Sequence, residues 1–249
     1  MKENRKHILV ALVLTLLVSG AASAYVLLSP ERTWDNAPTV IVDNRGQSSV
    51  TDGDGGASRT AAAITSNQAW NGAGAGTVVN AQVGSVSGWR LGDGTPMLNF
   101  ADPERVCSGS CLAATFTGFY SQRSDGSYRI NDADIVTNTR YSWTSEGEAD
   151  GCSSEFYIEG VMVHEVGHLL GLGHSNVAGA TMYPSVSSCN NSPATTENDD
   201  DAAIAALYSG GGGGGGGSCT LLPQGASCTS NSQCCSGSCK GKPGAKTCK

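Results

Sequence analysis

An unbroken run of eight glycines at 210–217 rules out a single packed domain for this chain of 249 residues. Glycine has no side chain to bury and loses much backbone entropy when it is ordered, so such a run behaves as a flexible linker. We therefore predict a linker at 209–218, which separates a large body at 25–208 from a small C-terminal module at 219–249.

The first 24 residues have the pattern of a secretory signal peptide. Three basic residues precede an apolar run at 8–18, and small residues follow up to Ala24. A basic start, a short apolar centre and an A-x-A site are typical of a signal that is cleaved. We expect cleavage after Ala24 and a protein that is secreted, either extracellular or periplasmic. The alternative is an uncleaved membrane anchor, because residues 25–28 extend the apolar stretch toward spanning length.

Cysteine count and charge bear on the compartment and on the partners. All ten cysteines follow the signal, and an even number in an exported chain indicates disulfides. The alternative, zinc thiolates, lacks the paired C-x-x-C spacing of structural zinc sites.

The net charge of −7 argues against a nucleic-acid partner. The last 41 residues carry four lysines and no acid, which favours an anionic surface or polysaccharide as a partner of the module. We expect a monomer.

The body has the pattern of strands mixed with helices, which indicates an α+β fold with an α/β-type layer. Strands are predicted at 39–42, 78–83, 96–100, 112–120 and 135–137, and helices at 58–70, 156–170 and 199–208. The helix predicted at 199–208 begins with acidic residues, which the helix dipole favours. The helix predicted at 156–170 has one apolar stripe for burial, made of Ile158, Val161, Met162, Leu169 and Leu170.

Most of the chemical information lies in the string H-E-V-G-H-L-L-G-L-G-H at 164–174. On a helix, His164 and His168 are four residues apart and project from one face, which suits two bonds to one zinc ion. Gly171 permits the helix to end in a turn with positive φ, which brings His174 back as a third ligand. Three protein ligands leave a fourth position for water, and this is the catalytic rather than the structural arrangement of zinc.

Glu165 follows the first ligand and is expected to lie beside the metal rather than on it. There it can act as a general base that takes a proton from the water activated by zinc. The alternative is a coincidental string on a surface helix. The histidine count argues against that alternative, because the chain has four histidines and only His7, in the signal, lies outside the string.

This string is the signature of the metzincins, and its flanks resemble the matrixins, specifically their compact bacterial members. Ser175 follows the third histidine, Met182 lies in a segment that resembles the methionine turn beneath the zinc, and Pro184 replaces the tyrosine of the astacin-like and serralysin-like enzymes. The resemblance implies a catalytic domain with a twisted mixed sheet and three helices. It also implies one catalytic zinc and an endopeptidase activity on protein or peptide substrates.

Other stretches of the body resemble the same family. Trp70 closes the first helix, 132–135 and Asn138 resemble the segment before the active-site helix, and Asp199 and Asp200 resemble the start of the C-terminal helix. Leu112 and Ala113 resemble the edge strand of the substrate cleft. The resemblance thus implies a cleft lined by Leu112, Ala113, Tyr183 and Pro184.

The chain also departs from the family pattern. It has no propeptide cysteine before Cys107, so thiol-switch latency does not apply, and it has no further histidines for a second, structural zinc. Calcium is a second candidate cofactor, because aspartates offer oxygen ligands. Solvated acidic loops are an equal alternative for each of the candidates, which are Asp52, Asp54, Asp93, Asp132 and Asp134.

In the body we predict the disulfides Cys107–Cys111 and Cys152–Cys189. In matrixin-like enzymes the loop that contains Cys189 walls the pocket for the first residue after the scissile bond, so the second pair would pin that loop.

The module at 219–249 has the cysteine spacing C-x8-C-x5-C-C-x3-C-x8-C and is too short for a hydrophobic core without covalent staples. Six cysteines allow fifteen pairings. The spacing resembles the inhibitor cystine knot, or knottin, and that resemblance implies the pairs Cys219–Cys235, Cys228–Cys239 and Cys234–Cys248.

Three functions remain open at this point. The first is a secreted zinc endopeptidase with a tethered binding module. The second is a zinc-stabilised, toxin-like or binding protein that acts through the knot, although such a protein needs no base such as Glu165. The third makes the knot an inhibitor of the chain's own cleft.

Overall fold

The structure is a computed structural model that describes residues 25–43, 56–66, 70, 79–88, 90–145, 152–208, 227–228, 239–242 and 245–248. The predicted signal at 1–24, the predicted linker at 209–218, Asp52 and Asp54 lie outside the described residues. Within these ranges, no helix combines the length and the apolar character needed to cross a membrane.

A mixed sheet of six strands forms the frame of the body. The strands are β1 (Arg32–Thr33), β2 (Thr39–Asp43), β3 (Asn80–Gly84), β4 (Met97–Asn99), β5 (Ala113–Gln122) and β6 (Tyr128–Thr137). Their order is β1-β6-β4-β2-β3 with parallel neighbours, and β5 pairs antiparallel with β6 off this path. Within the described part of the chain β5 has no second strand partner, so it is an edge strand with one open side.

Five of the six strands were predicted. The strands predicted at 39–42, 78–83, 96–100 and 112–120 correspond to β2, β3, β4 and β5, and the one predicted at 135–137 is the end of a longer β6. β1 was missed because two residues are too short for a period-2 pattern. It forms only because Arg32 and Thr33 pair with β6 across the fold.

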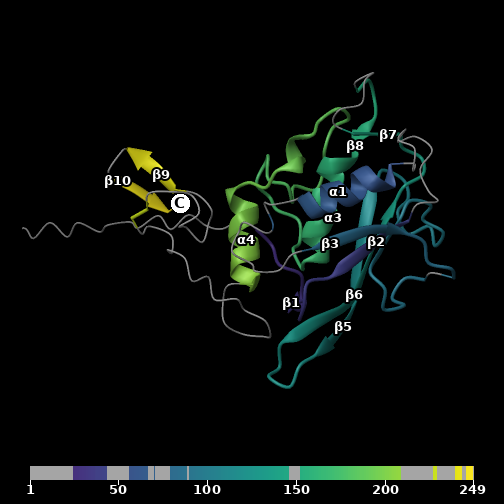
Figure 1. The fold of residues 1–249 in the computed structure, drawn as a ribbon, viewed down its shortest axis with the longest axis horizontal. Helices are drawn as coiled ribbons and strands as arrows, with labels where there is room; N and C mark the ends of the chain where they lie inside the picture. The colour runs from purple at the N-terminus through teal and green to yellow at the C-terminus, as the bar shows by residue number, and fades with distance from the viewer. Residues whose placement is uncertain are drawn as a thin grey trace, which may run out of the picture.

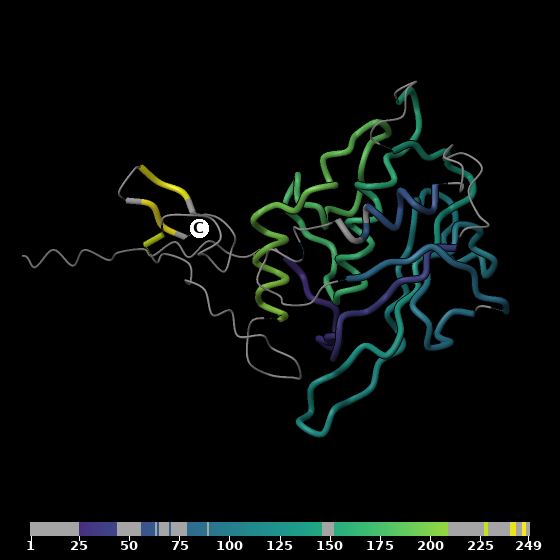
Figure 2. The backbone as a smooth tube through the Cα atoms, viewed as in Figure 1, coloured from purple at the N-terminus to yellow at the C-terminus, as the bar shows by residue number. Residues whose placement is uncertain are grey.

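In the described part of the chain the α-helices are α1 (Ala57–Ser66), α3 (Ile158–Leu169) and α4 (Asn198–Tyr208), and a short 3-10 helix η1 (Ser192–Ala194) precedes α4. α1 and α3 contact each other and strands of the sheet, and the outer end of the β5–β6 hairpin extends away from the helices (Figure 1). Figure 2 shows the N-terminal segment of the body, in purple, beside its green C-terminal part.

The prediction for α3 needs two corrections. Phe156 and Tyr157 are not helical but form strand β8 (Phe156–Tyr157), which pairs with β7 (Trp143–Thr144), because aromatic residues favour a half-buried strand. The helix also has more than one buried stripe, since Val163 and Val166 are buried together with the five predicted residues. A helix covered on most sides is a central element of the core rather than a surface helix.

Two tryptophans fix α3 by hydrogen bonds as well as by packing. The Trp70 indole donates to the main-chain oxygen of Val163 at 3.1 Å, and the Trp34 indole donates to that of Leu169 at 2.8 Å. Both side chains lie in the main hydrophobic cluster. A buried indole needs an acceptor, so these bonds specify the position of the helix as well as adding to its burial.

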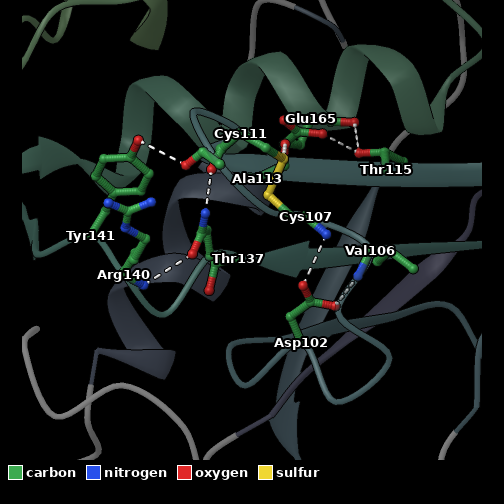
Figure 3. Close-up of a disulfide and its surroundings, with 12 residues drawn as sticks. Asp102, Val106, Cys107, Cys111, Ala113, Thr115, Thr137, Arg140, Tyr141 and Glu165 are labelled. Atoms are coloured by element: carbon green, nitrogen blue, oxygen red, sulfur yellow. Dashed lines mark hydrogen bonds between the residues drawn. A yellow bond between two sulfur atoms is a disulfide. The ribbon is translucent and has the colours of Figure 1, made fainter.

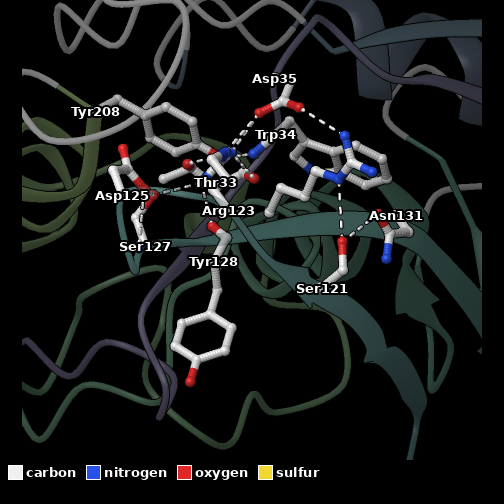
Figure 4. A network of polar contacts seen from close by, with 11 residues as sticks. Thr33, Trp34, Asp35, Ser121, Arg123, Asp125, Ser127, Tyr128, Asn131 and Tyr208 are labelled. Carbon is white, nitrogen blue, oxygen red and sulfur yellow. Dashed lines mark hydrogen bonds and ion pairs between the residues drawn. The ribbon is translucent and has the colours of Figure 1, made fainter.

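The outer end of the β5–β6 hairpin is tied to the N-terminal segment by Arg123 (Figure 4), and Arg129 adds an ion pair of 3.5 Å with Asp35. Arg123 donates to Asp35 Oδ1 from Nε at 2.8 Å, to the Thr33 main-chain oxygen at 3.0 Å and to the Tyr128 main-chain oxygen. These bonds join β1 to the hairpin that carries the edge strand.

Both disulfides predicted for the body are present, Cys107–Cys111 and Cys152–Cys189. In the C-terminal module the structure describes a hairpin of β9 (Cys239–Lys242) and β10 (Ala245–Cys248), in which Cys239 lies opposite Cys248. Each predicted knot pair includes a cysteine whose side chain lies outside the described part, so the knot connectivity stays a prediction.

Candidate metal centre

Three histidine side chains converge at the C-terminal end of α3. His164 and His168 project from the helix, and the chain turns at Gly171, whose φ is 107°, to bring back His174. One ring nitrogen from each histidine lies within 4.8 Å of the others, and His168 Nε2 is 3.2 Å from His174 Nε2. The turn that the sequence predicts at Gly171 is therefore present.

Main-chain oxygens set the orientation of the two helical histidines. His164 Nδ1 lies 2.6 Å from the Thr181 oxygen and His168 Nδ1 lies 2.8 Å from the Leu172 oxygen. A carbonyl oxygen only accepts, so each Nδ1 carries the hydrogen and each Nε2 presents a lone pair. Burial lowers the pKa of both His164 and His168 to about 4, which keeps the rings neutral and able to bind a metal.

This donor set fits zinc. Two nitrogens bound to one tetrahedral zinc at ~2.05 Å stand about 3.3 Å apart, close to the 3.2 Å between His168 and His174. The described residues offer one other triad, Cys152, Glu155 and Cys189, but its sulfurs form a disulfide and are not free to bind a metal.

An N-terminal strap, residues 25–28, supports the turn that carries the third histidine. Leu28 N–H donates to the Gly171 oxygen at 3.0 Å, Gly173 N–H donates to the Val26 oxygen at 2.7 Å, and Leu27 bridges to Leu172. The same Leu172 supplies the oxygen that orients His168. The strap therefore positions two of the three ligands through the main chain.

The segment 180–184, here called the methionine turn, packs Met182 tightly against α3. Met182 is 1% exposed, and a Cβ built on Gly167 would stand 2.2 Å from its sulfur. Only glycine at this helix position permits such a close approach.

A buried carboxylate on α4 holds the methionine turn. Asp200, which is fully buried, accepts N–H bonds from Thr181 at 2.7 Å, Met182 at 3.0 Å and Glu197 at 2.9 Å. Asp200 holds the Thr181 main chain, and the Thr181 oxygen orients His164. Asp200 therefore affects the orientation of His164 indirectly, through Thr181. From the sequence, Asp200 is expected only to favour the helix dipole and to match the family pattern, since no local pattern indicates a contact across 18 residues.

Glu165 lies beside the histidines and is 4% exposed. Its Oε2 is 2.5 Å from the hydroxyl of Thr115 on the edge strand, and that hydroxyl is also 3.0 Å from the Glu165 main-chain oxygen (Figure 3). Burial raises the pKa of the Glu165 carboxyl above its usual value. No local pattern distinguishes Thr115 from the other β-branched residues expected in a strand.

A cleft of about 830 Å³ opens over these groups. The residues that the sequence placed in the cleft all line it, namely Leu112, Ala113, Tyr183 and Pro184, together with the three histidines and Glu165. Five residues of the segment 112–117 form one wall, so the open side of β5 faces the cleft.

The opposite rim of the cleft is pinned at several points. The disulfide Cys152–Cys189 and a bond of 2.9 Å from Cys189 N–H to the Glu155 oxygen fix the loop after Pro184. Further along, Asn191 Oδ1 accepts the N–H of Gly160 on α3 at 3.1 Å. The other disulfide closes the loop before the edge strand, and Cys111 lines the cleft (Figure 3).

Three of the aspartates considered for calcium accept main-chain N–H bonds, and calcium binding stays a prediction. Asp134 accepts N–H bonds from Gly92 at 2.9 Å and Met97 at 3.2 Å, and Asp132 Oδ2 accepts one from Gly94 at 2.8 Å. Asp93 caps its own turn by accepting from Arg90 and Thr95. Among the described residues no three carboxylates gather as a cation site.

Comparison with known proteins points to one family. Residues 100–209, less than half of the chain, match the Matrixin family model. The chain is 50% identical to "Metalloendoproteinase 1" of Glycine max over 46 residues, which are 18% of this chain and 15% of that protein. It is 42% identical to "Metalloendoproteinase 2-MMP" of Arabidopsis thaliana over 50 residues, 19% of this chain and 13% of that protein. It is 63% identical to "Metalloendoproteinase 5-MMP" of the same plant over 30 residues, 12% of this chain and 8% of that protein. The matched segments thus span 15% or less of these relatives.

Proposed function

We propose that this chain is a secreted zinc endopeptidase of the matrixin type. The observation that carries the proposal is the convergence of three histidine nitrogens beside the buried Glu165, at the open side of an edge strand. The matrixin match and the names of the plant metalloendoproteinases support the same activity. Within the family, the sequence resemblance to compact bacterial members stays part of the proposal.

The shape of the cleft suits an extended peptide. β5 has main-chain N–H and C=O groups on its open side, and a substrate segment can add to them as a further strand. Beside the histidines, apolar side chains of Val161, Val186 and Phe156 line the cleft and can take one substrate side chain. Main-chain pairing explains why the substrate class is a peptide rather than a small molecule.

The residues of the chain divide the chemistry among them. His164, His168 and His174 would hold the zinc, which when bound supplies a Lewis acid that activates water and polarises a carbonyl. Glu165 takes one proton from the attacking water and passes it to the leaving amine as the C–N bond breaks. Water thus adds its oxygen to the carbonyl carbon and a proton to the amine nitrogen. The buried site keeps other water away from Glu165.

Two single variants, Glu165→Gln and His168→Ala, test the proposal when each is compared with the wild type. A general base contributes about 10²–10⁴-fold to rate, so Glu165→Gln should lose at least 100-fold in casein or peptide hydrolysis while it still binds zinc. His168→Ala should instead lose zinc, because two ligands remain. Zinc content and hydrolysis are measured on the same preparations. Substantial turnover by Glu165→Gln would reject the role of the base, and a zinc-loaded wild type without hydrolysis would favour the binding-protein alternative.

The module, in this proposal, tethers the exported enzyme to an anionic surface or polysaccharide. Residues directly opposite each other in a hairpin share a face, so Lys240 and Lys242 lie on one face and Lys246, opposite Gly241, lies on the other. Lys240 and Lys242 are both exposed. Substituting both by Gln should weaken retention of the full chain on an anionic polysaccharide column, and Lys246→Gln should weaken it less. Equal retention of all forms at low salt would reject the tether.

A further inference from the structure

We propose that Thr115 is a positioning residue for the general base, which fixes the Glu165 carboxylate before substrate arrives. The inference rests on the proposed endopeptidase function. It starts from the short contact of 2.5 Å between the Thr115 hydroxyl and Glu165 Oε2 (Figure 3). An O–H···O hydrogen bond spans about 2.5–3.0 Å, so the Thr115 hydroxyl, which donates, holds Glu165 Oε2 at the short end of that range.

Thr115 is well placed for this role by its strand. It lies near the start of β5, paired with Ile135 of β6, and its branched side chain has restricted χ1 freedom. The hydroxyl also lies 3.0 Å from the main-chain oxygen of Glu165, so it contacts both the side chain and the backbone of the base. The edge strand and the metal-binding helix are thereby joined at the reacting residue.

The bond also selects which carboxylate oxygen reacts. Within the described part of the chain, Thr115 is the side chain that hydrogen-bonds to the Glu165 carboxylate, and the bond occupies Oε2. Oε1 therefore remains for the proton of the attacking water. A catalytic group held in one orientation avoids reorganisation when the reaction begins, and supporting hydrogen bonds are the usual means of holding it.

A merely structural role predicts a different result. If Thr115 only filled space on β5, valine, which has nearly the same shape, would replace it without loss of turnover. If it positions Glu165, removing the hydroxyl leaves a buried carboxylate without its partner and free to turn.

The experiment compares Thr115→Val, Thr115→Ser and the matched control Thr137→Val on the full zinc-loaded chain. Thr137 is a fully buried threonine on β6 that donates to the Phe100 oxygen and lies outside the cleft. Thr115→Val should lower kcat about 10- to 100-fold, a share of what a general base contributes, with KM within about threefold. Thr115→Ser should keep kcat within about threefold of the wild type because it retains the hydroxyl. Thr137→Val should leave kcat unchanged.

A readout without turnover tests the bond itself. In zinc-free protein, a urea double-mutant cycle of Thr115→Val with Glu165→Ala should show that the two substitutions are not additive. Zinc content should stay at the wild-type level in Thr115→Val.

Three outcomes would overturn the positioning role. They are wild-type kcat in Thr115→Val, a loss in Thr115→Ser as large as in Thr115→Val, and additive stability effects. If the wild type itself hydrolyses no peptide, the proposed function falls and the positioning role falls with it. If the wild type is active and Thr115→Val matches it, only the positioning role falls.

Discussion

The metal side of the cleft and its rim are held together by different means. On the metal side, α3, the methionine turn and α4 are joined by buried hydrogen bonds, as Asp200 and Trp70 illustrate. On the rim, exposed loops are closed by two disulfides, Cys107–Cys111 and Cys152–Cys189. A hydrogen bond gains strength where water is excluded, whereas an exposed loop competes with solvent for every polar contact. The difference indicates that disulfides hold the rim, where hydrogen bonds are weakened by solvent, and that buried hydrogen bonds suffice on the metal side.

The comparison also separates two tasks. The metal side must hold three nitrogens within a few tenths of an ångström, and the rim must hold the shape of a pocket. We therefore expect substitutions on the metal side to act on zinc binding and those on the rim to act on stability and substrate choice.

The largest effect is expected from Asp200→Ala. Three buried N–H groups lose their acceptor, each at about 1–3 kcal/mol, so the free energy of unfolding should fall by about 3 kcal/mol or more. The methionine turn then no longer fixes the Thr181 oxygen behind His164, and zinc affinity should fall at least about tenfold. Urea unfolding and zinc titration against a competing chelator measure the two effects. Asp200→Asn, which keeps one acceptor oxygen, is the matched control, and wild-type zinc affinity in Asp200→Ala would contradict the prediction.

A smaller effect is expected from Gly167→Ala. The added Cβ would stand 2.2 Å from the Met182 sulfur and 3.0 Å from the Trp70 ring, so the methionine must move. Overpacking of this kind costs about 1–3 kcal/mol, partly offset by the better helix propensity of alanine. We expect a lower unfolding midpoint and a few-fold loss of zinc affinity. Gly118→Ala, where a Cβ meets nothing within 4 Å, controls for the substitution itself. Equal zinc affinity and midpoint in Gly167→Ala and Gly118→Ala would show that the close approach is unimportant.

The smallest effect on zinc is expected from the disulfide variants. Replacing Cys152 and Cys189 by serine opens a loop of sequence separation 37, for which chain entropy predicts a loss of about 4 kcal/mol. The same change at Cys107 and Cys111, with a separation of 4, predicts about 2 kcal/mol. Both variants should keep zinc affinity within about twofold, since the main-chain oxygens of Thr181 and Leu172, and neither disulfide, orient His164 and His168. A peptide-library profile should broaden in the first variant. A tenfold loss of zinc affinity in either variant would break the distinction between metal side and rim.

Local patterns predicted the ligand site well. The spacing of His164, His168 and Gly171 encodes a helix, its end and the return of a third ligand, and all of this lies within 11 residues. The two disulfides of the body and the edge strand at Leu112 and Ala113 were also predicted, the strand from the family resemblance.

Contacts between distant residues were not predictable from local pattern. Thr115 lies 50 residues from Glu165, and the strap pairs Leu27 with Leu172. The start of α3 was misjudged for a related reason, since Phe156 and Tyr157 become a strand only because Trp143 and Thr144 lie beside them. In each case the residue that determines the local structure lies far away in the sequence and comes close only in the folded protein. Such tertiary contacts override local secondary-structure propensity.

The strap at 25–28 has a consequence for the order of folding. The metal site needs the first residues of the body to meet the turn after α3, and the Trp34 bond to Leu169 spans 135 residues. Closing such long loops is entropically costly and slow, so the ligand turn should become ordered late, after the sheet has formed. If the zinc site is completed only after the transition state of folding, bound zinc stabilises the native state but does not stabilise that transition state. The metal would then slow unfolding far more than it speeds folding, and its main contribution would be kinetic persistence of the finished enzyme.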